Sequence, residues 1–200
     1  MLFGLLFFIR TIIMGFGIEL SFRPTGVLMG KGLEKILEKN KPAIVKQWFN
    51  LAAQTYAIDT AQFLKSKSDP FANPVGNAMM TGLDGILEQL IHTLDPKALN
   101  SHLDSIIRIR AIQDFTPSQA TAFILSLKKV LRDYLAKELQ DSRLAAEFIE
   151  LESKIDQICL MAFDIYMQCR EKVYQISANE TRNRTFKAFE RAGLIKESQQ

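Results

Sequence analysis

The sequence predicts an all-α fold, a helical bundle with a long C-terminal helix. Apolar residues recur at three- and four-residue spacings through most of the chain from residue 33 to residue 176. No stretch alternates apolar and polar residues over the length of a strand. Proline follows a capping residue at Asn73-Pro74, Asp95-Pro96 and Thr116-Pro117. This order is typical of a helix N-terminus, so it marks where helices begin.

The composition is that of an ordinary globular chain. Its 200 residues are 48% apolar and 24% charged, which suits one domain with a substantial core. The net charge of +3 is too small and dispersed to indicate a nucleic-acid partner. Cys159 and Cys169 are separated by about 15 Å of helical rise, too far for a disulfide within one straight helix. We interpret them as reduced thiols of a cytoplasmic protein.

Residues 1–28 form an apolar N-terminal extension. Leu, Ile and Phe are frequent in residues 1–20, but Arg10 interrupts the run, and a spanning helix needs about 20 apolar residues. The basic segment that begins a signal peptide is missing. We expect the natural start to be Met29, with the preceding residues lying upstream of it. A weak membrane anchor is the alternative, and it requires residues 1–20 to be translated.

The first half of the chain predicts four helices. The first covers residues 33–56 and contains Pro42, so either two helices meet there, with Asn40 capping the second, or one helix is kinked. Asp59 and Gln62 fit a capping box for a short helix that follows. Asn73-Pro74 and Asp95-Pro96 begin the next two helices. The first of these carries Gly76, Gly82 and Gly85, which allow another helix to approach closely.

The second half of the chain begins with the strongest local signal for a helix start. Thr116-Pro117-Ser118-Gln119 combines a capping box with proline in the first turn of a helix that reaches Leu135. Asp141 then starts a long amphipathic helix over residues 141–192, whose apolar seam runs from Leu144 to Ile176 at near-heptad spacing. Such a seam either completes the bundle or pairs with a second copy through residues 144–176. Residues 193–200 should fray.

The sequence carries no recognisable catalytic motif. The sequence lacks the GxSxG, GxGxxG, Walker, HExxH and paired CxxC patterns. We therefore expect no enzymatic activity, no bound metal and no cofactor. His92 shares a helix face with Glu88, so its side chain should be solvated. His102 aligns with an apolar face and is the candidate ligand in a haem-binding alternative.

Two connecting segments, residues 69–76 and 107–120, contain the candidate functional residues. Arg108 and Arg110 point to opposite sides, because two residues turn a helix by about 200°, so one of them should face a neighbouring element. Gln113 and Asp114 can bond the exposed backbone of residues 69–76. The network either pins two loops together or borders a ligand pocket or partner surface. The candidates are Asp69, Phe71, Asn73, Arg108, Arg110, Gln113 and Asp114.

Three stretches carry a family resemblance: residues 39–48, 69–76 and 108–120, with Leu127-Lys128 following. In them the sequence resembles the N-terminal domain of the RsbT co-antagonist protein RsbRD over residues 30–140. The resemblance implies a helical sensory input domain of bacterial stress signalling. Such domains usually precede a STAS or histidine-kinase module and modulate release of the switch kinase RsbT. Related input domains resemble globins that have lost haem, so the resemblance also allows a globin-like packing of the helices.

The resemblance also shapes the functional expectation. The long helix from Asp141 onward leaves no room for a STAS or kinase pattern, so we expect a stand-alone copy. We therefore predict a non-enzymatic, cytoplasmic regulatory protein that acts by contact with a signalling partner, with homodimerisation as an option. The alternatives are a ligand- or haem-binding globin-like sensor that uses His102, and a membrane-attached accessory subunit.

Overall fold

The computed structural model describes residues 29–66, 71–92, 94–113 and 115–194, and within these ranges it contains helices and no strand. This confirms the all-α prediction. The expectations for residues 1–28 and 195–200 lie outside the described residues. The elements are α2 (Lys31–Ala53), α3 (Ile58–Ser66), α4 (Pro74–Ile91), α5 (Pro96–Ile112), α6 (Pro117–Tyr134), the 3₁₀ turn η1 (Glu138–Gln140) and α7 (Ser142–Arg191).

The proline-associated helix starts are confirmed. Asn73 accepts a hydrogen bond from the Gly76 amide at 2.9 Å, and Asp95 accepts one from the Lys97 amide at 3.0 Å. Thr116 and Gln119 form the complete capping box of α6. The capping box predicted at Asp59 is wrong: α3 begins at Ile58, so Asp59 already lies inside the first helical turn.

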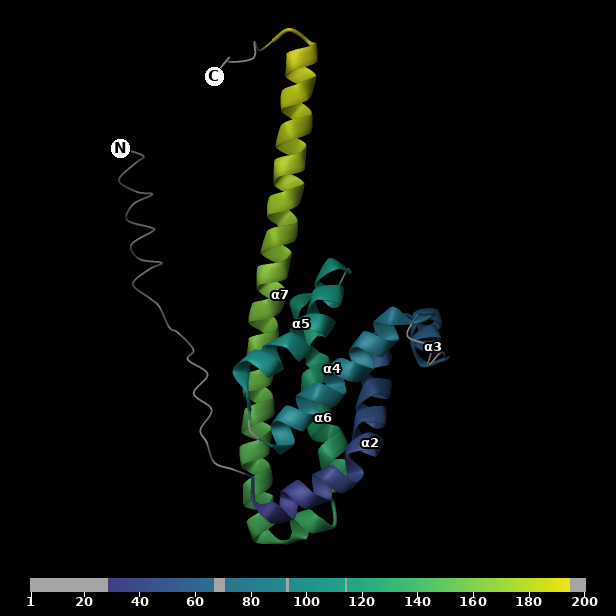
Figure 1. Cartoon of the computed structure of the whole chain (residues 1–200), viewed down its shortest axis with the longest axis vertical. Coiled ribbons are helices and arrows are strands. Elements are labelled where there is room, and N and C mark those ends of the chain that lie inside the picture. Colours follow the sequence, from purple (N-terminus) through teal and green to yellow (C-terminus); the bar gives the residue numbers. More distant parts are fainter. Residues whose placement is uncertain (1–28, 67–70, 93, 114, 195–200) are drawn as a thin grey trace, which may run out of the picture.

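Pro42 lies inside one helix that bends. Helix α2 is continuous from Lys31 to Ala53, and Figure 1 shows its two halves running in different directions. Proline has no amide hydrogen to donate and crowds the preceding turn, which explains a bend at this point. The Asn40 side chain donates to the Ile36 carbonyl at 2.8 Å and does not cap a second helix.

The core forms where α2, α4, α5 and α6 pack against one another and against the first half of α7. Trp48 of α2 is fully buried; its indole Nε1 donates to the Phe123 carbonyl of α6 at 2.7 Å, and the two rings stack. The two cysteines are free thiols and partly buried. Burial raises the pKa of the Cys159 thiol, which keeps that thiol protonated at neutral pH.

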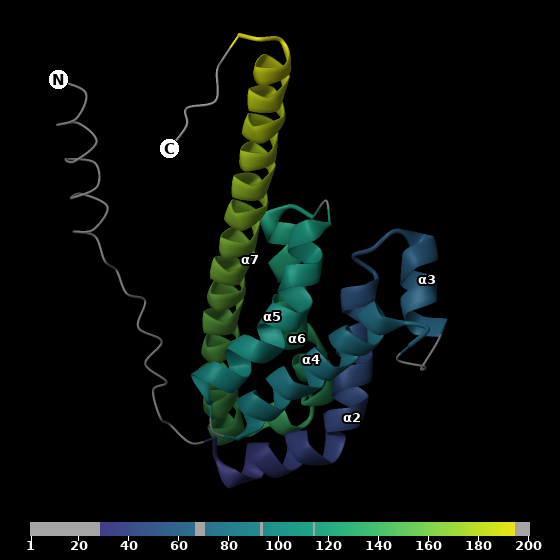
Figure 2. The same cartoon turned by 45° about the horizontal axis from the view of Figure 1, so that its top comes forward.

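Helix α7 consists of two parts with different surroundings. Its first part lies along α5 and α6, while its last part projects beyond the bundle (Figures 1 and 2). The buried positions of its seam are Phe148, Leu151, Ile155, Ile158, Ala162 and Ile165, joined by Tyr166. These residues pack within the chain and help to complete the bundle, while pairing with a second copy through residues 144–176 stays a prediction.

The far end of α7 stops at a glycine. Gly193 has a φ of 69°, and the amides of Gly193 and Leu194 donate to the carbonyls of Glu190 and Phe189. These two bonds are those of the Schellman motif. None of the described helices is long and apolar enough to cross a membrane.

Candidate functional site

Arg110 of α5 ties three helices together from the inside of the bundle. The side chain is 0% exposed. Its Nη2 donates to the Ala52 carbonyl at 3.1 Å and to Thr55 Oγ1 at 3.0 Å, at the end of α2. Its Nη1 donates to the Gln119 carbonyl at 3.2 Å, in the first turn of α6. One side chain therefore fixes the end of α5 against α2 and α6.

Aromatic rings surround this guanidinium. Its carbon lies 4.6 Å from the ring centre of Phe123 and 5.0 Å from those of Tyr56 and Phe115. Among the described residues no carboxylate forms an ion pair with Arg110. Burial lowers the pKa of Arg110 and raises that of Tyr56, where the Arg110 charge opposes the rise. The faces of the rings and the carbonyls thus take the place of a counter-ion.

Arg108 has the opposite environment. It is exposed and pairs with Asp104, one turn earlier on α5, at 2.7 Å. The hydrogen bond to Asp104 raises the pKa of Arg108. The prediction that one of the two arginines faces a neighbouring element is confirmed, and that residue is Arg110.

The segment before α4 is organised around Asn73. This side chain is 1% exposed, and its Nδ2 donates to the Leu64 carbonyl at 2.8 Å while its Oδ1 caps α4. Phe71, in contrast, is 96% exposed. Asn73 therefore joins α3 to α4, whereas Arg110 joins α5 to α2 and α6. The candidates Asp69 and Asp114 lie outside the described residues.

Gln113 and Phe115 mark the joint between α5 and α6. Gln113 follows the last residue of α5, and its buried Oε1 has no hydrogen-bond partner among the described residues. Phe115, Thr116 and Pro117 line one side of a shallow hollow of about 360 Å³ whose other side is α7. The residues that α7 contributes to this hollow are Tyr166, Met167, Arg170 and Tyr174.

Two side chains of α7 hold it against this joint. Tyr166 donates its hydroxyl to the Phe115 carbonyl at 2.5 Å. Arg170 donates to the Ala111 carbonyl at 3.1 Å and to the Tyr174 hydroxyl at 2.8 Å. Among the described residues, the bonds to the Phe115 and Ala111 carbonyls are the last ones from α7 to the bundle, and the bond to Tyr174 lies within α7. Sequence reasoning missed these residues, because the apolar seam continues past them to Ile176 and gives no sign that the bundle ends here.

Beyond this clamp, which Tyr166 and Arg170 form, α7 presents large apolar side chains to solvent. Tyr174 and Ile176 are 61% and 60% exposed, and Phe186 and Phe189 are also exposed further along. On the outward face of the clamped part, Leu160, Phe163 and Met167 are exposed as well, at three- and four-residue spacings. Exposed apolar groups gathered on one helix are typical of a surface that contacts another molecule.

The two histidines have different surroundings. The imidazole of His102 lies directly over Gly85, where an added β-carbon would come within 2.6 Å of the ring. Its ring thus fills the close approach of α5 to α4. The side chain of His92 is 41% exposed, which confirms the prediction that it is solvated. His92 lies 3.2–3.6 Å from carboxylates of Glu34, Glu38 and Glu88.

The polar groups around His92 connect α2 to α4. Lys41 of α2 forms ion pairs with Asp84 at 2.9 Å and with Glu88 at 2.6 Å, both on α4. The hydrogen bond from Lys41 lowers the pKa of Glu88. Burial alone lowers the pKa of Lys41, but its bonds to Glu88 and Asp84 outweigh this effect and raise it.

Comparison with known proteins gives one family and one distant relative of note. Residues 42–181 match the family described as RsbT co-antagonist protein rsbRD N-terminal domain, a span that includes most of α7. An uncharacterized protein of Archaeoglobus fulgidus is 31% identical over 83 residues, which are 41% of this chain and 51% of the relative. The chain thus spans about half the length of that relative. No solved structure matches the chain significantly.

Proposed function

Because this chain belongs to the RsbT co-antagonist protein rsbRD N-terminal domain family, we propose that it is a signalling input domain that acts by contact with a partner protein and catalyses no reaction. The bundle formed by α2 to α6 receives the signal. The projecting part of α7, residues 171–191, makes the contact.

The observation that carries this proposal is the division of α7 at Arg170. Before this residue one face of the helix is buried against the bundle, and after it the helix continues to Arg191 with exposed aromatic and aliphatic side chains. An isolated helical segment in water gains little from backbone bonds alone and is stabilised mainly by packing of an apolar face. The projecting part therefore has a surface that packing against a partner would stabilise.

The clamp gives a physical route from the bundle to this surface. The joint between α5 and α6 is held internally by Arg110 and is bonded externally to Tyr166 and Arg170. A shift of α5 relative to α6 changes the position of the Ala111 and Phe115 carbonyls, to which α7 is anchored. The direction of the projecting helix then follows the state of the bundle.

A truncation tests the proposal, and its position matters. Deletion from Asp141 onward would remove the buried α7 residues and unfold the bundle. A chain that ends at Gln175 keeps the bonds of Tyr166 and Arg170 and loses most of the projecting part, with Ile176, Phe186 and Phe189. Ile58→Ser on α3 is a matched control, because Ile58 is 76% exposed but lies on the bundle.

The tagged full chain, the truncated chain and the Ile58→Ser chain are each expressed in cells of the natural source, and co-purifying proteins are quantified by mass spectrometry. We expect one partner to be enriched by the full chain and by Ile58→Ser, and to be lost from the truncated chain. Circular dichroism checks that the truncated bundle is folded. Equal enrichment by a folded truncated chain would overturn the proposal.

A further inference from the structure

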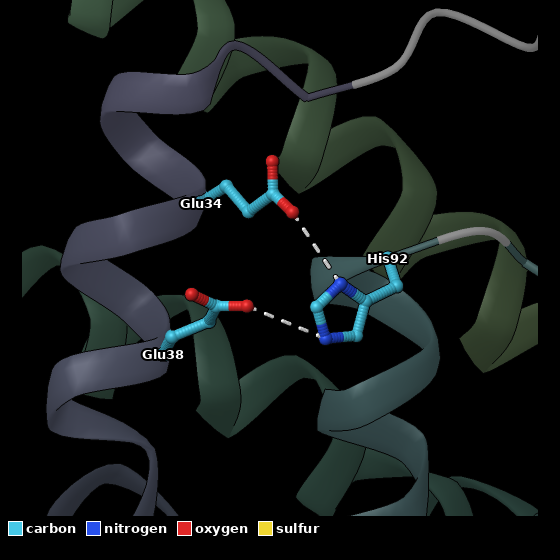
Figure 3. A group of neighbouring side chains, drawn as sticks. All are labelled: Glu34, Glu38 and His92. Atoms are coloured by element: carbon cyan, nitrogen blue, oxygen red, sulfur yellow. Dashed lines mark ion pairs between the residues drawn. The ribbon is translucent and has the colours of Figure 1, made fainter.

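Four side chains with metal-binding donor atoms converge where the first half of α2 lies against the end of α4. Glu34 and Glu38 are one turn apart on α2, and Glu88 and His92 are one turn apart at the end of α4, so each pair shares a helix face. Figure 3 shows Glu34 and Glu38 reaching across to the two ring nitrogens of His92. Because Leu33 and Leu37 beside the two glutamates are fully buried, the backbone that carries them is fixed.

The distance between His92 Nδ1 and Glu34 is that of two ligands of one metal ion, whereas Glu38 lies nearer the other ring nitrogen and would turn toward the ion. His92 Nδ1 lies 3.4 Å from Glu34 and Nε2 lies 3.6 Å from Glu38, both longer than an ordinary N–H···O hydrogen bond of about 2.7–3.2 Å. Around a tetrahedral zinc ion with bonds of about 2.1 Å, two donor atoms are separated by about 3.4 Å. One donor atom from each of Glu34, Glu38 and His92 lies within 4.8 Å of the other two.

The charge of the group also favours a divalent cation. Four carboxylates lie in this region, and Lys41 forms ion pairs with two of them, Asp84 and Glu88. Glu34 and Glu38 have only His92 as a partner within this group. The side chains of Glu34, Glu38, Glu88 and His92 are each between about one-third and one-half exposed. An ion can therefore enter from solvent and keep water ligands.

We propose that Glu34, Glu38 and His92 bind a divalent transition-metal ion of the zinc class, with His92 coordinating through Nδ1. The Nε2 proton then faces Glu88, 3.2 Å away, which Lys41 holds in place. A carboxylate that orients a ligating histidine in this way is a common supporting group of metal sites. Imidazole with carboxylates suits zinc, manganese or iron, whereas magnesium and calcium prefer oxygen ligands alone. The ion ties the first half of α2 to α4, and this inference does not depend on the proposed function.

The test is a titration of the chelator-treated full chain with zinc chloride, followed by calorimetry and by NMR of the imidazole groups. The chain has only two histidines, so the signals of His92 are identified by their loss in His92→Ala. We expect one equivalent of zinc to bind, to shift the His92 signals and not those of His102, and to raise the melting temperature. Magnesium should produce none of these effects.

The variants separate ligands from supporting groups. We expect His92→Ala and Glu38→Gln to weaken zinc binding by about 100-fold, and Glu88→Gln to weaken it by about tenfold. His102→Ala is the matched control and should bind as the wild type does. Zinc affinity unchanged in both His92→Ala and Glu38→Gln would place the ion elsewhere, for example on the cysteines, and would overturn the proposal. Failure of zinc at millimolar concentration to bind the wild type would overturn it equally.

Discussion

The buried Arg110 allows a sharp test of how the bundle is held together. Arg110→Ala removes three hydrogen bonds, to the Ala52 and Gln119 carbonyls and to Thr55 Oγ1, and leaves a cavity between three aromatic rings. A hydrogen bond from a charged group contributes about 1.5–3 kcal/mol. The cavity adds to the loss, while relief from burying a charge offsets part of it. We expect the free energy of unfolding to fall by about 3–5 kcal/mol.

Two further variants separate charge from volume. Arg110→Met keeps most of the volume between the rings and removes the buried charge, so we expect a smaller loss of about 1–3 kcal/mol. Arg108→Ala is the matched control on the same helix. Because Arg108 is exposed and, among the described residues, pairs with Asp104 on the surface, its removal should leave the stability close to that of the wild type.

Urea denaturation followed by tryptophan fluorescence measures all three variants. The chain has one tryptophan, Trp48, which is buried and stacked on Phe123, the ring closest to the Arg110 guanidinium. The probe therefore reports on the region that the substitution disturbs. If Arg110→Ala lowered the stability by less than about 1 kcal/mol, or no more than Arg108→Ala, the account of Arg110 as the internal tie between helices would be refuted.

Three other predictions concern local packing, capping and reactivity. Gly85→Ala places a methyl group against the His102 imidazole, and the ring has to turn away to make room for it. Calorimetry should therefore show non-additive effects of Gly85→Ala and His102→Ala on the melting temperature; additive effects would contradict the packing described here. Thr116→Ala breaks the capping box of α6 and should cost about 1 kcal/mol in urea denaturation; an unchanged midpoint would show that the cap does not stabilise the helix. Burial raises the pKa of Cys159, so at pH 8 less of it is thiolate than in the unfolded chain. Its alkylation, followed by mass spectrometry, should therefore be slower in the folded protein and accelerate as pH rises; equal rates in folded and unfolded protein would contradict this.

The features that sequence analysis predicted correctly are mostly local in the chain. Asn73, Asp95 and Thr116 cap helices because their partners are two or three residues away, and such short spacings can be seen directly in the sequence. Pro42 was ambiguous for the opposite reason. Whether a proline breaks or bends a helix depends on the packing of both halves, and here both halves of α2 bury apolar residues.

The features that sequence analysis missed depend on contacts between distant segments. Arg110 was expected to be one of two residues that could face inward, but its partner Ala52 is 58 residues away along the chain. The contact of His92 with Glu34 and Glu38 depends on how α2 and α4 are aligned, which no periodicity within either helix reveals. The division of α7 depends on where the bundle ends, and the apolar seam runs past that point to Ile176.

The most direct test of the signalling account is site-specific photo-crosslinking along α7 in cells of the natural source. A photoreactive phenylalanine analogue replaces Ile176 on the projecting part or, as the control, Ile58 on α3, since both positions are exposed. The account predicts that the probe at position 176 captures a discrete partner protein and that the probe at position 58 does not. Capture of the same partner at position 58 alone, with none at position 176, would contradict it.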